Sequence, residues 1–102
     1  MSRAAAALLR ALLARAGVSR DRILLSEVRS VDWRSLTFTG EQHSIRLRLC
    51  GADAEQALAR LIDGIEDAEF VIAGQIVGDI RADRCTDADG VCVAIEALTI
   101  AE

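Results

Sequence analysis

Alternating hydrophobic and polar positions predict four β-strands in this chain. Residues 91–100 are apolar on both alternating faces, with Glu96 as the only charge, which is typical of a central strand that is covered on both sides. Residues 33–39, 44–49 and 69–81 also alternate with a period of two. The chain is therefore expected to build a sheet whose last strand lies in the interior.

The first two of these strands are predicted to form a tight hairpin around the turn residues 40–42. In that register Leu36 and Phe38 lie beside Ile45 and Leu47 on the core face. The arginines that alternate with the apolar residues of the second strand then point to the other face.

Leucine and alanine at helical spacing predict two helices. Residues 3–16 form the first, with Ser2 as its cap and Gly17 as its end. The second covers residues 53–66 and begins at Asp53 in the form of a capping box. The segment between the first helix and the first strand shows no sustained period, so it is given no element.

The order of elements is helix, strand, strand, helix, strand, strand. Moving the last strand to the front gives the order of the ferredoxin-like fold, which this chain resembles as a circularly permuted relative. We expect an α+β fold with a four-stranded antiparallel sheet in the order 1-2-4-3 and both helices on one face. A chain of 102 residues is long enough for one core and too short for two ordinary domains, so residues 1–102 are expected to form a single domain.

The sheet face without helices is expected to carry more apolar surface than a monomer usually exposes. Its apolar side chains are predicted to be Trp33, Val71, Ala73, Val77, Leu98 and Ile100. A second copy of the chain would cover this face across a two-fold axis, which predicts a homodimer. In an alternative arrangement, residues 23–31 fold across the face of their own chain.

The same face supplies the candidate binding residues. They are Trp33, Arg46, Arg48, Gln75, Glu96 and Leu98. Because the fourth strand lies beside the second, Glu96 is expected to pair with Arg46 or Arg48.

The sequence favours a small cytoplasmic module that binds a protein partner or a small anionic ligand without catalysis. An alternative is a small enzyme with a pocket on the open face, in which His43 or Glu96 acts as acid or base and Arg46 and Arg48 bind an anionic substrate. Nucleic-acid binding is disfavoured, because the net charge is −4 and Trp33 is the only aromatic residue on that face. No segment is apolar for long enough to span a membrane.

The three cysteines, Cys50, Cys85 and Cys92, are an odd number without close paired spacing, which favours a reducing cytoplasmic setting. They are interpreted mainly as small apolar residues, with a bridge between Cys85 and Cys92 as the less favoured alternative. A zinc site with His43 is disfavoured, because His43 and Cys50 point to opposite faces of one strand.

The loop before the last strand resembles a calcium-binding loop only in part. Asp87, Asp89, Gly90 and Glu96 match four ligand or turn positions of an EF-hand, but Cys85 stands at the first position and the flanks alternate like strands. We therefore expect a hairpin loop without calcium, and no metal or cofactor in the protein.

Overall fold

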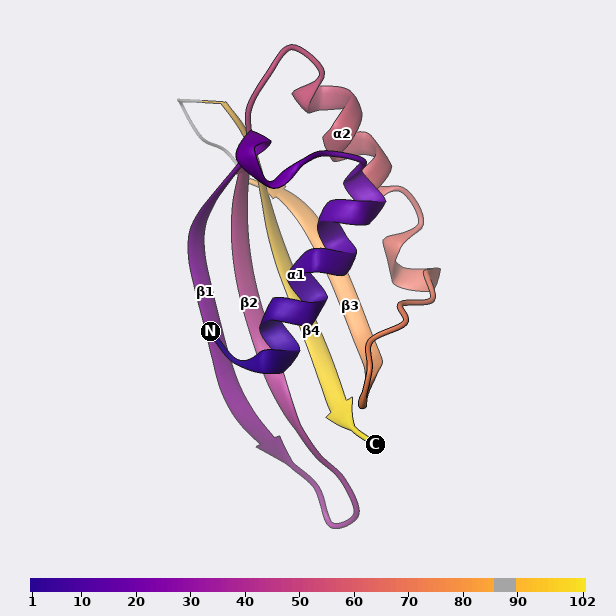
Figure 1. Ribbon diagram of the computed structural model, residues 1–102. Helices are drawn as coiled ribbons and strands as arrows, with labels where there is room; N and C mark the ends of the chain where they lie inside the picture. The colour runs from indigo at the N-terminus through magenta and orange to yellow at the C-terminus, as the bar shows by residue number, and fades with distance from the viewer. Residues whose placement is uncertain (86–89) are drawn as a thin grey trace.

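The chain folds into a four-stranded antiparallel sheet with both helices on one of its faces (Figure 1). This computed structural model describes residues 1–85 and 90–102. Within them the elements are α1 (Arg3–Ala16), β1 (Ile23–Arg34), β2 (Thr39–Leu49), α2 (Ala54–Ile62), β3 (Gln75–Cys85) and β4 (Val91–Ala101). The strand order is β1-β2-β4-β3, which confirms the predicted α+β fold and places β4 in the interior of the sheet.

Helix α1 begins and ends at the residues that the sequence predicts. Ser2 Oγ accepts a hydrogen bond from the backbone N–H of Ala5 at 3.1 Å. At the other end, Gly17 has a φ of 71°, a left-handed conformation that glycine adopts at little cost. Leu8 and Leu12 are fully buried against the sheet side, as the helical spacing requires.

The segment without a clear period is the edge strand β1, and a bulge explains the irregular pattern. The pairing with β2 shifts between Leu25 and Glu27, so that two residues of β1 lie opposite one residue of β2. The alternation changes phase at Ser26, and Leu25 and Val28 both face the core although they are three residues apart. The alternative in which this segment crosses the open side of the sheet is therefore wrong.

The first hairpin turns earlier than the sequence predicts, at residues 35–38. Leu36 and Phe38 lie in this turn, where they are 105% and 54% exposed. Their predicted places on the core face are occupied by Leu25 and Val28 of β1. Because β1 and β2 are both long, the hairpin extends beyond the layer of helices (Figure 1).

Strand β3 carries a second bulge, between Val77 and Asp79. The shift turns Val77 to the core and leaves Ile76 on the opposite face, the reverse of the predicted assignment. Val71 and Ala73 precede the strand and are exposed, so they do not belong to the sheet face on which the sequence places them. The strict period of two fails here for the same physical reason as in β1.

Helix α2 is shorter than the predicted range of residues 53–66, and its capping box does not form. The side chain of Asp53 makes no capping hydrogen bond; its carboxylate pairs with Arg22, which lowers the pKa of Asp53. Arg84 of β3 pairs with Glu55 at 2.7 Å and lowers the pKa of that carboxyl group. These ion pairs fasten the first turn of α2 to the segment before β1 and to β3.

The C-terminal ends of the two helices meet, and each is capped by an arginine of the other helix. Arg15 of α1 donates from Nε to the carbonyl oxygen of Leu61 at 3.0 Å and from its terminal nitrogen to the carbonyl of Asp63. Arg60 of α2 donates from Nε to the carbonyl oxygen of Ala16 at 2.9 Å. Carbonyl groups at a helix end lack partners within the helix, so the two arginines satisfy them reciprocally.

Candidate interaction face of the sheet

The face of the sheet that points away from α1 and α2 is here called the open face. The strand register and the buried residues of β2 and β4 define its side chains. They are Leu24, Glu27, Arg29, Val31 and Trp33 of β1; Gln42, Ser44, Arg46 and Arg48 of β2; Cys92, Ala94, Glu96, Leu98 and Ile100 of β4; and Ile76, Asp79, Arg81, Asp83 and Cys85 of β3.

One end of the open face is apolar. Trp33 of β1, Ile100 of β4 and Ile76 of β3 lie in one row across the sheet, with only a glycine of β2 between them. Leu98 and Val31 lie in the next row. Val31 is 49% exposed and Ile76 is 50% exposed, so this end presents apolar surface to solvent.

The rest of the open face carries balanced charge. Four of its residues are arginines and four are acidic. Arg29, Arg46 and Arg48 accompany Glu27 on β1 and β2, whereas Asp79, Asp83 and Glu96 accompany Arg81 on β3 and β4. One half of the face is therefore basic and the other half acidic, although the total is neutral.

Glu96 lies at the centre of the open face and accepts a hydrogen bond from Ser44 Oγ at 2.8 Å. In the register of the sheet, Glu96 lies between Ser44 of β2 and Arg81 of β3. Arg46 is opposite Ala94, and no ion pair joins Arg46 to Glu96 within residues 1–85 and 90–102. Ser44 is therefore a partner of Glu96 that the sequence analysis, which expected Arg46 or Arg48, did not name.

Five of the six candidate binding residues share the open face: Trp33, Arg46, Arg48, Glu96 and Leu98. The sixth, Gln75, lies on the helix side, because the following residue, Ile76, takes the open side. Gln75 lines a groove of about 440 Å³ between α1 and residues 71–75, together with Arg3 and Arg10. The sequence analysis missed Arg29 because the irregular pattern left residues 23–31 without a predicted element, whereas Arg81 follows Asp79 by simple alternation and could have been assigned to the face.

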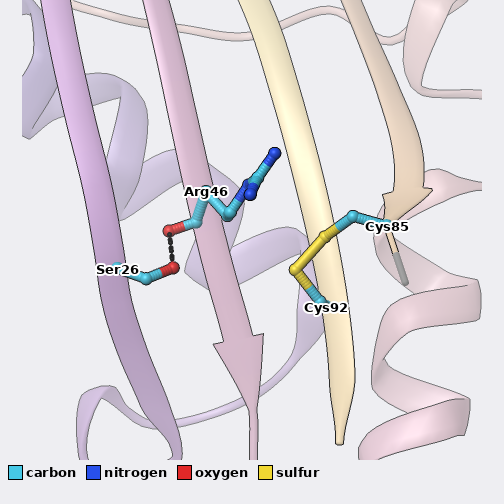
Figure 2. The surroundings of a disulfide bond; sticks show 4 residues. All are labelled: Ser26, Arg46, Cys85 and Cys92. Carbon is cyan, nitrogen blue, oxygen red and sulfur yellow. Dashed lines mark hydrogen bonds between the residues drawn. A yellow bond between two sulfur atoms is a disulfide. The ribbon is translucent and has the colours of Figure 1, made fainter. Parts of the chain in front are cut away.

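A disulfide joins Cys85 at the end of β3 to Cys92 at the start of β4, with the two Cα atoms 5.2 Å apart (Figure 2). The bridge lies on the same side of the sheet as the Arg46 side chain, and Ser26 Oγ of β1 donates to the Arg46 carbonyl at 3.1 Å (Figure 2). Cys50 is a free, exposed thiol. The interpretation of all three cysteines as small apolar residues is wrong for the bridged pair, and the less favoured alternative of a bridge is the one found.

The bridge also changes the two metal hypotheses. Sulfur atoms in a disulfide are not thiolate ligands, so they do not complete a zinc site. No group of three or more potential metal ligands occurs in the part of the chain that the structure describes. Asp87 and Asp89 of the calcium-like loop lie outside the described residues.

His43 is fully buried on the helix side of β2. Its Nδ1 is 2.7 Å from Ser30 Oγ and its Nε2 is 2.8 Å from Thr99 Oγ1, so the ring links β1, β2 and β4. Burial lowers the pKa of His43, and the nearby Glu41 opposes that shift. His43 therefore cannot share a site with the arginines of the open face.

Comparison with protein-family models, curated proteins and solved structures finds no match for this chain. Among the described residues, no helix is long and apolar enough to cross a membrane. The functional argument therefore rests on the open face itself.

Proposed function

We propose that this protein is a non-catalytic interaction module that forms a homodimer through its open face. The observation that carries the proposal is the row of Trp33, Ile76 and Ile100, with Leu98 and Val31 beside it, on a sheet face that no helix of the described chain covers. Burial of exposed apolar surface is the main driving force for association between proteins.

The size of the face also suits a dimer. Four strands spaced about 4.8 Å apart, each of about eleven residues rising about 3.3 Å, give a sheet face of roughly 700 Å². A standard interface buries about 800 Å² on each partner, so the open face is close to the required area. Its balanced charges do not repel a second copy, whereas a face of one sign would.

The proposal is tested by the solution mass of the protein and of the variant Leu98→Glu, measured by sedimentation equilibrium at micromolar concentration. The wild type is expected at about twice the chain mass of 11.0 kDa, and Leu98→Glu near the chain mass, because the charge would lie within the contact. The matched control is Leu36→Glu in the exposed hairpin turn, which should remain a dimer.

A wild-type protein with a mass near 11.0 kDa would contradict the homodimer. The open face would then be examined for a different protein partner or a small anionic ligand near Arg46 and Arg48. The enzyme alternative retains only Glu96 as an acid or base on this face, because His43 is buried on the other side.

The cytoplasmic location expected from the cysteine count is also a proposal. The disulfide between Cys85 and Cys92 argues against it, because such bonds persist mainly in oxidising compartments. Measuring the fraction of bridged protein in cells by thiol trapping tests the point, and a fully reduced pair would support the cytoplasm.

A further inference from the structure

The two halves of the sheet are built on the same plan at a constant spacing. Strand β1 begins at residue 23 and β3 at residue 75, whereas β2 spans 39–49 and β4 spans 91–101, a separation of 52 residues in each case. The bulges follow the same spacing, between residues 25 and 27 in β1 and between residues 77 and 79 in β3. A shared irregularity at equivalent positions indicates an internal repeat of a helix and two strands.

The sequence carries the repeat most clearly around the bulges. The segment Leu-Leu-Ser-Glu-Val-Arg-Ser of residues 24–30 corresponds to Ile-Val-Gly-Asp-Ile-Arg-Ala of residues 76–82. Each position holds the same residue or one of similar character or size. The tripeptide Leu-Ala-Arg ends at Arg15 in α1 and at Arg60 in α2, the two arginines that cap each other's helix, but these are 45 residues apart, so the helices do not share the 52-residue spacing of the strands.

The repeat relates the halves by a pseudo-two-fold axis normal to the sheet. Shifting the numbers by 52 converts the pairing of β1 with β2 into the pairing of β3 with β4, bulge included. By the same shift, Ser44 of β2 is equivalent to Glu96 of β4, and these two residues lie opposite each other in the register of the two strands. The axis therefore passes through the Ser44–Glu96 hydrogen bond at the centre of the open face.

Packing explains only part of what the two halves share. The apolar residues of the repeated segment, such as Val28 and Ile80, contact the core. Its charged residues, Glu27 and Arg29 in β1 and Asp79 and Arg81 in β3, are exposed on the open face. Within the described chain they form no ion pair or side-chain hydrogen bond, and acidic residues are not favoured in strands.

We propose that Glu27–Arg29 and Asp79–Arg81 are two equivalent recognition sites through which the open face binds a second copy of this chain. This inference rests on the homodimer proposed above and identifies the residues that direct it. An acidic residue and an arginine two positions apart on one face are self-complementary, because a second pair related by a two-fold axis places each arginine near a carboxylate. Packed sheets lie about 10 Å apart, a gap that an arginine and a carboxylate span together.

The experiment uses two full-length variants of opposite charge. In the first, Arg29→Glu and Arg81→Glu make both sites acidic; in the second, Glu27→Arg and Asp79→Arg make both sites basic. Each variant alone is expected to self-associate at least about 100-fold more weakly than the wild type, because like charges across an interface cost several kcal/mol. An equimolar mixture should recover a heterodimer that weakens as the salt concentration rises.

The control carries the same charge change on the helix side of the molecule. Arg3→Glu with Arg10→Glu alters two exposed arginines of α1 and should leave self-association unchanged. The single variants Arg29→Gln and Arg81→Gln add a test of equivalence, since both should weaken association by a similar factor, and circular dichroism verifies that each variant is folded.

The outcomes separate the two proposals. A monomeric wild type overturns the homodimer. A dimeric wild type whose charge-reversed variants still self-associate, or do not recover on mixing, overturns the recognition sites and leaves the homodimer in place. An effect of Arg29→Gln without an effect of Arg81→Gln overturns the equivalence of the two sites.

Discussion

Replacing Arg15 or Arg60 with methionine should destabilise the fold more than replacing any comparable surface arginine. The C-terminal ends of α1 and α2 meet, so two regions of negative partial charge and several carbonyl oxygens without helical partners lie close together. Methionine keeps an apolar stem of similar length but donates no hydrogen bond. Each substitution therefore removes the cap and leaves most of the packing.

The magnitude follows from the bonds that are lost. A hydrogen bond from a charged donor contributes about 1.5–3 kcal/mol when it is buried, and solvent around these partly exposed groups reduces that value. Each single variant should lower the free energy of unfolding by about 1–2 kcal/mol. In a protein of this size, each kcal/mol corresponds to a fall of roughly 4–8 °C in melting temperature.

Urea denaturation of the two single variants and the double variant measures the effect. Arg10→Met is the matched control, because Arg10 is an exposed arginine of α1 with no hydrogen bond to another described residue. Since both caps act on the same junction, the double variant should deviate from additivity by about 0.5 kcal/mol or more. Arg60→Met and Arg15→Met values within about 0.5 kcal/mol of the control would refute the reciprocal cap as a source of stability.

Two further predictions concern groups that the structure brings into the sheet. Because burial lowers the pKa of His43 below its ordinary 6.5, the unfolded chain takes up the proton first as the pH falls. The free energy of unfolding should therefore be highest above about pH 6.5 and should decline as the pH falls below that value. Denaturation curves that are unchanged between pH 8 and pH 5.5 would contradict this prediction. Cys85→Ser with Cys92→Ser should lower stability by about 2 kcal/mol, since the bridge closes a short loop with a sequence separation of 7. Cys50→Ser is the control and should change the melting temperature little; an equal loss there would show that the bridge is not the cause.

The order of elements could be predicted because most of the chain has a clear period. Helix α1 carries apolar residues at helical spacing between a serine cap and a left-handed glycine, and both ends lie where expected. Strand β4 is largely apolar on both faces, with Glu96 as its only charge, and its position between β2 and β3 follows from these two apolar faces. These local patterns agree with the final packing, so both elements can be predicted without knowing which other elements they pack against.

The predictions fail where the backbone departs from strict alternation. The bulges beside Ser26 and Gly78 add one residue to each edge strand. In β1 the extra residue breaks the alternation, so residues 23–31 were not predicted as a strand; in β3 it exchanges the faces of Ile76 and Val77. Alternation with Ile45 and Leu47 places His43 on the core side, but the turn expected at residues 40–42 left it outside the predicted strand of residues 44–49, and its hydrogen-bonding partner Thr99 is 56 residues away in the sequence. Comparison of residues 24–30 with 76–82 would have shown that the two segments are equivalent, and hence that residues 24–30 belong to a strand.

The internal repeat gives a physical reason for both the sheet and its open face. A single unit of one helix and two strands has too little core to be stable, because an isolated hairpin is marginal in water. Joining two units along β2 and β4 completes a four-stranded sheet with a helix layer on one side, but it leaves the other side as bare as before. Association of two whole chains through the open face would cover that side in turn. Because the acid–arginine pairs are equivalent by pseudo-symmetry, they allow a second chain to bind in two orientations. The two ends of the open face differ, since Trp33 at one end corresponds to the bridged Cys85 at the other, and this difference must select one orientation.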